Sequence, residues 1–437
     1  MNSNPQLRQE RLLLEQFKET RERTLELVKT LEKDDFVVQT AFFMSPPKWH
    51  IGHVSWIYEA IMGKMDKNYE FYSKEFSEYL NSYYQQFGVP HDKGLRGIIS
   101  RPTTDQIFQY FNTINQRVEQ FIESHTLNDE QVRLITMGFH HESQHQELLI
   151  YDLQHLLAEQ YRPAKKNAPP TPIKNVEEKS TIIKGGLYTM GYNGNDYCYD
   201  IELPEHKVFL NDYKIDVYPI TNEQYLKFIE EGGYQSYKYW LSDGWEKVKK
   251  NNWQAPMYWE KIDGKWNVRD FLGIREINPK EPVCHVSYYE ADAYCKWAGK
   301  RLPTEAEWEK AACWDENTQQ KMIFPWGNEK PSEEKCNLLE SYHWGCTEIG
   351  SYPNASSPAG CQQMIGDVWE WTASEFTGYP RFKSGFDEYN DKWFTNQKVL
   401  RGGSFGTPKM SIRGSYRNFF RLDERWLFSG FRCAEDI

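Results

Sequence analysis

Residues 134–156 read LITMGFHHESQHQELLIYDLQHL, and their apolar residues recur at the spacing of one helix face. The stretch predicts a helix over about 128–158. At about 100° per residue, His141 and His145 lie about 40° apart on this helix, so both imidazoles can reach one metal ion. The sequence therefore predicts a transition-metal site on the helix.

Two metal chemistries fit the same residues. The run from His141 to His145 matches the H-E-x-x-H pattern of zinc proteases, in which the glutamate, here Glu142, activates water. Spacing alone does not separate a zinc hydrolase from another metal enzyme. Glu147 lies about 200° around the helix from His145, so the third ligand must come from elsewhere in the chain.

The best source of a third ligand is the segment 44–56, MSPPKWHIGHVSW. It predicts the start of a second helix, with Ser45 as the N-cap and the following proline in the first turn. His50 and His53 are three residues apart, and either can face a neighbouring helix. Gly52 lets another backbone approach closely, which favours His53 as the ligand. The alternative for His50 and His53 is that they are ordinary histidines in a helix interface. The alternative for His141 and His145 is that they are surface histidines at chance helical spacing.

The chain divides at the proline-rich segment 161–180, which predicts a linker between 1–160 and 181–437. The first part predicts a four-helix bundle, a common setting for histidine-bound metals, with a long connection over about 68–102. Its helices are expected at about 6–32, 45–67, 103–125 and 128–158.

The second part predicts a mixed domain with much irregular loop. Short strand runs such as 208–210 alternate with Gly, Pro and Trp, and modest helices are expected near 221–231 and 288–299. A helical bundle followed by such a domain makes the predicted fold class α+β.

Composition favours a cytoplasmic enzyme that acts on small molecules. The net charge is −11 and no long Lys/Arg run occurs, which argues against nucleic acid and anionic membranes as partners. No signal core and no stretch of about 18 apolar residues is present. The eight cysteines lie in the second half without C-x-x-C pairs, so reduced and mostly buried thiols are expected. The sequence specifies no oligomeric state.

Five ordered landmarks in the second part carry a family resemblance. They resemble the formylglycine-generating-enzyme-like (sulfatase-modifying factor) fold, which is C-type-lectin-like. The first part, with Gly-His followed by His-x-x-x-His-x-Glu, resembles a DinB-like bundle. Together the two parts resemble the non-haem iron sulfoxide synthases of the ergothioneine type, also called hercynine oxygenases. The landmarks are 185–191 (GGLYTMG), 301–309 (RLPTEAEWE), 366–372 (GDVWEWT), 401–405 (RGGSF) and 430–432 (GFR).

The resemblance implies an oxidoreductase that uses Fe(II) and O2. It would join cysteine sulfur to C2 of the hercynine (Nα-trimethylhistidine) imidazole and give hercynylcysteine sulfoxide in ergothioneine biosynthesis. It implies iron ligation by His53, His141 and His145 and leaves Glu142 without a catalytic role. Formylglycine-generating enzymes need a cysteine pair after the Gly-Gly-Ser phrase, and residues 405–420 contain none. Copper-dependent thiol oxidation is therefore not expected.

The resemblance also implies a proton donor and a hercynine site. Tyr83 or Tyr84, in the long connection, is expected to protonate or reduce an oxygen intermediate. Gln144 corresponds to the residue that contacts the substrate imidazole. Asn418 and Phe419 correspond to contacts of the trimethylammonium group, which aromatic faces bind well. Simple packing is the alternative for the aromatic residues.

The sulfur donor is assigned from three further residues. Family members that use γ-glutamylcysteine carry an acidic residue where this chain has Phe420, which favours free cysteine here. Arg96 and Arg425 are the expected partners of the cysteine carboxylate. Surface ion pairing is the alternative for both arginines.

Other functions stay open at this point. Sibling synthases would use γ-glutamylcysteine, attach cysteine to C5 of histidine as in ovothiol biosynthesis, or take a selenium donor. A zinc hydrolase, with Glu142 facing the metal, and a non-catalytic binding module are more distant. A structural Ca2+ ion in the second domain is also expected from related folds, although no acidic loop identifies its ligands.

Overall fold

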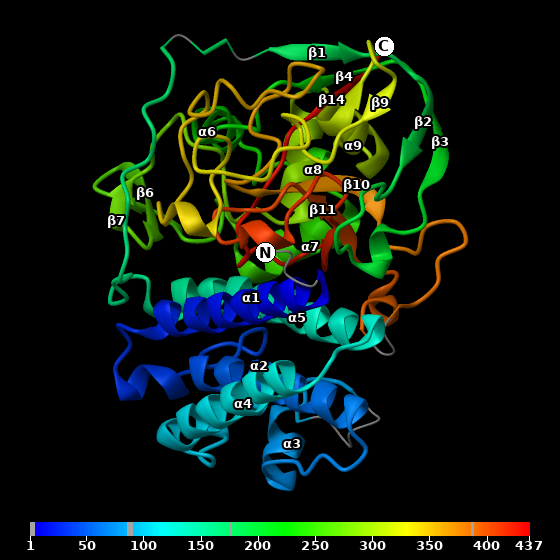
Figure 1. Ribbon diagram of the computed structural model, residues 1–437. Helices are drawn as coiled ribbons and strands as arrows, with labels where there is room; N and C mark the ends of the chain where they lie inside the picture. Colours follow the sequence, from blue (N-terminus) through cyan, green and yellow to red (C-terminus); the bar gives the residue numbers. More distant parts are fainter. Residues whose placement is uncertain (1–4, 85–90, 175, 178, 386–388) are drawn as a thin grey trace. The chain divides into compact units, whose positions relative to one another are not determined.

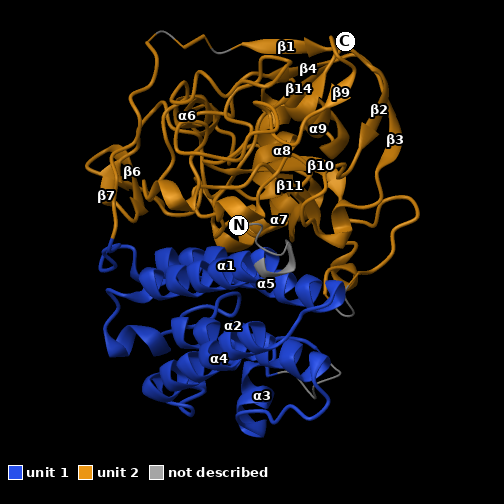
Figure 2. Cartoon of the chain, in the orientation of Figure 1, with its two compact units in different colours: residues 1–164 blue, residues 165–437 orange. Residues whose placement is uncertain are grey.

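The computed structural model describes residues 5–84, 91–174, 176–177, 179–385 and 389–437. The chain divides into two compact units, 1–164 and 165–437 (Figure 2). Long helices make up the first unit, and short helices with several small sheets make up the second (Figure 1). The α+β class is therefore confirmed. None of the helices in the described residues has the length and apolar character of a membrane span.

Four helices of the first unit lie close to where the sequence predicts them. The first ends earlier than expected, at Val28, and a 3₁₀ helix, Lys33–Val37, follows. The backbone N–H of Glu32, just before this 3₁₀ helix, donates to Asp35. The four are α1 (Pro5–Val28), α2 (Pro47–Met65), α4 (Thr104–Ser124) and α5 (Asp129–Leu157).

Side-chain caps start α4 and α5, and α2 starts differently from the prediction. Thr103 and Asn128 each accept from a backbone N–H in the first turn of their helix. The prediction of Ser45 as the cap of α2 is wrong, because Pro46 occupies that position. The Ser45 hydroxyl accepts instead from the Arg96 guanidinium at 2.8 Å. It therefore joins two segments and leaves the α2 amides uncapped.

The connection before α4 holds more structure than expected. Residues 68–102 contain α3 (Lys74–Leu80), capped by Ser73, and a 3₁₀ helix, Lys93–Ile98. A Cβ at Gly52 would lie 2.6 Å from the Leu80 side chain and 2.9 Å from that of Ile107. The atoms nearest to Gly52 thus belong to side chains of α3 and α4 rather than to another backbone.

Helix α2 forms the centre of the first unit. It packs against α3, α4 and α5, and α1 packs against α4 and α5. Every residue from Pro47 to Met62 except Ala60 is buried, which is typical of a helix surrounded by others. Polar side chains on α2 and on the facing side of α5 are thereby removed from water.

The second unit contains short strands, as predicted, and they form several small sheets. In the largest, β10 pairs with β11 antiparallel and with β13 parallel. The strands, grouped by sheet, are β1 (Ser180–Ile183), β4 (Tyr213–Asp216) and β14 (Ala434–Asp436); β12 (Asn418–Phe420), β11 (Lys398–Arg401), β10 (Trp369–Glu375) and β13 (Ser429–Gly430); β2 (Gly186–Met190) and β3 (His206–Leu210); β5 (Trp259–Ile262), β6 (Lys265–Asp270) and β7 (Gly273–Glu276); β8 (Trp314–Asp315) and β9 (Gln320–Lys321).

The helices of the second unit include two that the sequence analysis missed. Helices α6 (Asn222–Glu230) and α8 (Tyr288–Trp297) lie at the predicted places, whereas α7 (Ser242–Asn251) and α9 (Glu305–Cys313) were not expected. Thr304 caps α9 in a box with Glu307, a spacing that the sequence contains.

Buried ion pairs connect the landmark motifs to one another. Arg401 of the RGGSF motif pairs with Glu309 of the RLPTEAEWE motif, and both side chains are fully buried. Arg432 of the GFR motif donates to Glu370 of the GDVWEWT motif at 2.7 Å. Charged residues of these landmark motifs thus have a structural role, because they pair with one another in the interior of the second unit. All eight cysteines are free and five of them are buried, as predicted.

Candidate metal centre

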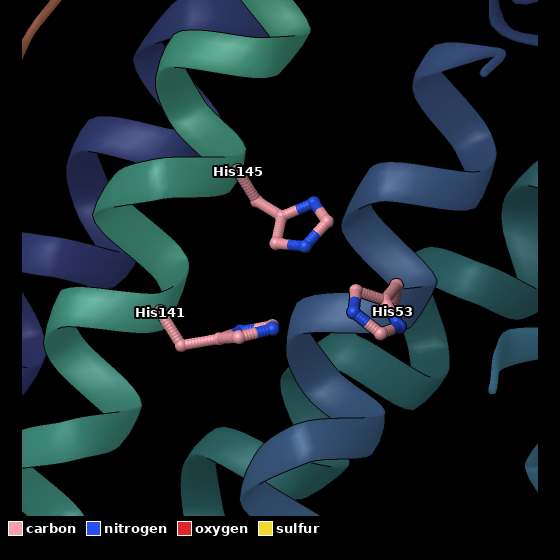
Figure 3. A group of neighbouring side chains, drawn as sticks. All are labelled: His53, His141 and His145. Carbon is pink, nitrogen blue, oxygen red and sulfur yellow. The ribbon is translucent and has the colours of Figure 1, made fainter. Parts of the chain in front are cut away.

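Three histidines of the first unit converge between two helices. His53 comes from α2, and His141 and His145 come from successive turns of α5 (Figure 3). One ring nitrogen from each lies within 4.8 Å of the others. Ring centroids are 4.5 to 5.1 Å apart. The imidazoles therefore surround a space that one ion can fill.

The three imidazoles are held in their neutral form. Burial lowers the pKa of His141 to about 3. Burial, with repulsion from neighbouring imidazoles, lowers the pKa values of His53 and His145 well below the usual range. Neutral imidazole is the form that binds metals. The cluster thus presents lone pairs at neutral pH without first losing protons.

The orientation of His53 is fixed by its surroundings. Its Nδ1 lies 2.6 Å from the carbonyl oxygen of Leu80, which can only accept, so Nδ1 carries the proton. Trp49 and Trp56 stack on the ring at centroid distances of 4.5 and 5.6 Å. The remaining Nε2 is buried and has no hydrogen-bond partner among the residues described. A buried acceptor of this kind fits a metal ligand.

His50 lies beside the cluster and binds a carboxylate. Its Nε2 lies 2.8 Å from Asp152 Oδ2, and its Nδ1 lies 3.2 Å from His145 Nδ1. His53 is therefore the member of the 44–56 segment that joins the three-nitrogen group, whereas His50 contacts it from outside.

Glu142 faces away from the histidines. Its carboxylate, fully buried, accepts from Thr24 at 2.5 Å and pairs with Arg21 at 3.2 Å, both on α1. A zinc protease needs this glutamate beside the metal-bound water. The H-E-x-x-H match is therefore met in spacing but not in geometry, which removes the main support for the hydrolase alternative.

Arg96 is buried close to the cluster. Its guanidinium lies 3.4 Å from the centre of the Trp49 ring, and burial lowers its pKa to about 9. Its Nε has no partner in the described part of the chain. Surface ion pairing, the alternative for Arg96, therefore does not apply. The side chain of Gln144, the residue before His145, lies half-buried on α5.

The two tyrosines lie on the aromatic side of the cluster. The rings of Tyr83 and Tyr84 are 4.6 Å apart, and Tyr84 lies 5.8 Å from Trp56, which stacks on His53. Tyr84 is buried, and its backbone N–H donates to Asn81. One aromatic series therefore runs from His53 to Tyr83.

The remaining predicted residues belong to the second unit. Asn418, Phe419 and Phe420 form β12 and are half-buried. The Phe419 ring stacks on Phe376 at 3.9 Å. Arg425 donates to the buried Glu290 at 2.7 Å, so a protein carboxylate already partners this cation. Each of these contacts lies within the second unit.

The sequence analysis did not identify Asp152 as the partner of His50. Asp152 lies seven residues after His145, which places both on one face of α5. That spacing, together with His50 in the 44–56 segment, is the signal that could have identified the pair.

The two halves match two family models. The model for the DinB superfamily matches residues 16–149, and the model for the Sulfatase-modifying factor enzyme 1-like domain matches residues 165–437. Both predicted folds are confirmed.

Individual relatives extend the match over up to 95% of the chain. A hercynine oxygenase of Mycolicibacterium smegmatis is 32% identical over 433 residues, which cover 95% of this chain and 97% of that protein. A hercynine oxygenase of Mycobacterium tuberculosis is 36% identical over 308 residues, 70% of this chain and 72% of that protein. A formylglycine-generating enzyme of Bos taurus is 29% identical over 303 residues, 63% of this chain and 77% of that protein.

Proposed function

Because the chain belongs to the hercynine oxygenase family, we propose that it joins cysteine sulfur to C2 of the hercynine imidazole in an Fe(II)- and O2-dependent reaction. The product would be hercynylcysteine sulfoxide, an intermediate of ergothioneine biosynthesis. The observation that carries the proposal is the group of three neutral, converging imidazoles of His53, His141 and His145.

The three histidines would hold the iron. An iron ion held by these three imidazoles would supply the chemistry that activates O2 and binds the donor thiolate. The neutral state of the three imidazoles and the fixed tautomer of His53 support this assignment, because neutral imidazole binds metal without losing a proton. Glu142 plays no part in the chemistry, in line with its contacts to α1.

The sulfur donor would be bound through its carboxylate. Arg96 suits this role because it is a buried cation with an Nε that has no partner among the described residues. Arg425, with its charge balanced by Glu290, would act in orienting the donor rather than in neutralising it. Phe420 brings no negative charge that would bind the amine of γ-glutamylcysteine, so free cysteine is the proposed donor.

Hercynine would be recognised at both of its ends. The side-chain amide of Gln144 would contact the imidazole, and its place one residue before His145 supports this role. Asn418 and Phe419 would contact the trimethylammonium group, for which a flat aromatic face and a polar oxygen are suitable. The phenol of Tyr83 or Tyr84 would donate a proton during oxygen reduction.

The free cysteines of the chain indicate its cellular compartment. Free thiols persist in a reducing compartment, so we propose the cytoplasm. A structural Ca2+ ion in the second unit stays a prediction from related folds, in which backbone carbonyls as well as carboxylates can bind the ion.

A product assay tests the proposal and separates the sibling activities. Protein loaded anaerobically with Fe(II) would be exposed to O2 with hercynine and cysteine, with hercynine and γ-glutamylcysteine, and with histidine and cysteine. Mass spectrometry is expected to detect the sulfoxide mainly from the first pair. Product from the third pair alone would replace the proposal by an ovothiol-type activity. Purified protein that holds zinc and makes no sulfoxide would overturn it.

A further inference from the structure

His145 is linked through His50 to a buried carboxylate. His145 Nδ1 lies 3.2 Å from His50 Nδ1, and His50 Nε2 lies 2.8 Å from Asp152 Oδ2. His50 is 4% exposed and Asp152 is 2% exposed. The contacts therefore lie inside the helical bundle, where water does not compete for them.

The chemistry of the groups fixes the positions of the protons. A carboxylate only accepts, so His50 donates from Nε2, and in its neutral form it accepts at Nδ1. The proton between the two Nδ1 atoms then belongs to His145. His145 consequently keeps its lone pair on Nε2, the nitrogen not engaged by His50.

Asp152 is itself held in place by a second segment. Its Oδ2 also accepts from the Ser45 backbone N–H at 2.9 Å, and the Ser45 hydroxyl accepts from Arg96 at 2.8 Å. The network thus fastens α5 to the residues that precede α2 and reaches the proposed site for the donor carboxylate.

We propose that His50 and Asp152 form a positioning pair that sets the tautomer and ring orientation of His145 for metal binding. The inference deepens the proposed function and rests on its metal site. It gives the two ends of the cluster different supports: a backbone carbonyl, that of Leu80, orients His53, whereas a histidine–carboxylate pair orients His145. Outer partners of this kind typically alter metal affinity by about 10- to 100-fold.

Metal titrations of four variants test the pair. Asp152→Asn removes the charge, His50→Leu removes both ring nitrogens, and His50→Gln keeps one donor and one acceptor. Glu59→Gln is the matched control, because Glu59 is a fully buried carboxylate on α2 that binds tyrosines and Arg117. Each protein would be titrated anaerobically with Fe(II), and with Co(II) as an absorbing substitute, after its thermal unfolding midpoint is recorded.

A positioning role of His50 and Asp152 predicts how metal affinity and the Co(II) spectrum differ among the four variants. Asp152→Asn and His50→Leu should bind Fe(II) about 10-fold or more weakly and should shift the Co(II) ligand-field bands. His50→Gln should recover most of the affinity, and Glu59→Gln should bind like the unmodified protein. A purely structural role would lower the unfolding midpoints but leave the Co(II) spectrum unchanged.

The result that would overturn the inference is equal metal affinity and an identical Co(II) spectrum in Asp152→Asn, His50→Leu and the control. If the unmodified protein binds neither Fe(II) nor Co(II), the proposed function itself fails, and the inference fails with it. The two failures are thus distinguished in one set of titrations.

Discussion

The last residue of α3, Leu80, places its carbonyl oxygen 2.6 Å from His53 Nδ1. A short helix in the connection between α2 and α4 therefore decides which nitrogen of His53 faces His141 and His145. Because a metal site depends on such outer contacts, residues that only support α3 should influence metal binding.

Gly52→Ala should weaken both the fold and metal binding. The added methyl would lie 2.6 Å from the Leu80 side chain, so this side chain at the end of α3 must shift, at a cost of about 1–3 kcal/mol. Urea unfolding and Fe(II) titration would measure the two effects. The double variant Gly52→Ala/Leu80→Ala makes room for the methyl and should bind Fe(II) better than Gly52→Ala. Equal affinity in both would contradict the proposed link between α3 and His53.

Glu142→Gln should destabilise the protein without removing metal binding. The substitution leaves the buried Arg21 guanidinium without its carboxylate, which typically costs about 3–5 kcal/mol. Denaturant unfolding and the Fe(II) content of the purified variant would be measured. An unchanged unfolding free energy with loss of the metal would indicate that Glu142 serves the metal site after all.

Acid should weaken the second unit partly through Glu309. Burial alone would raise the pKa of this carboxyl, but the Lys321 and Arg401 cations lower it to about 2. Because the folded pKa lies below the ordinary value of about 4.5, the folded state holds fewer protons between these pH values. The stabilisation, about 3 kcal/mol, is present above pH 4.5 and is lost as the pH falls toward 2.

The Glu309→Gln variant tests whether the charge of Glu309 causes this loss of stability at low pH. The variant should be less stable than the unmodified protein at pH 7, and the difference should narrow at pH 3. Urea unfolding at the two pH values measures it. A stability difference that does not depend on pH would show that the carboxylate charge is not the source.

Phe420→Asp should move donor preference toward γ-glutamylcysteine. The new carboxylate would bind the amine of that donor, and one charged hydrogen bond is worth about 10-fold in affinity. The ratio of kcat/KM for γ-glutamylcysteine to that for cysteine would be compared with the ratio in Phe420→Leu. Because Phe420 is half-buried against Trp426, Phe420→Leu controls for lost packing. The same ratio in both variants would remove Phe420 as a specificity residue.

The sequence is most informative where the site depends on one helix. His141 and His145 follow from the helical period alone, and each half carries motifs that identify its fold. The approach of His53 depends on the packing of α2 against α5, so spacing left His50 and His53 as alternatives. Helix α3 was missed because seven residues give a weak periodic signal. Ser45 is not the cap because Pro46 occupies that position, and its hydroxyl accepts instead from Arg96, 51 residues away; no local pattern records such a contact.

The central claim is that the three histidines hold an iron that joins hercynine and cysteine. The most direct measurement is oxygen consumption by anaerobically Fe(II)-loaded protein given both substrates, with mass spectrometry of the product and His53→Ala as the control. We expect O2 uptake with hercynylcysteine sulfoxide from the unmodified protein and neither from the variant. Uptake and product that persist in His53→Ala, or sulfoxide absent from the unmodified protein despite bound Fe(II), would contradict the claim.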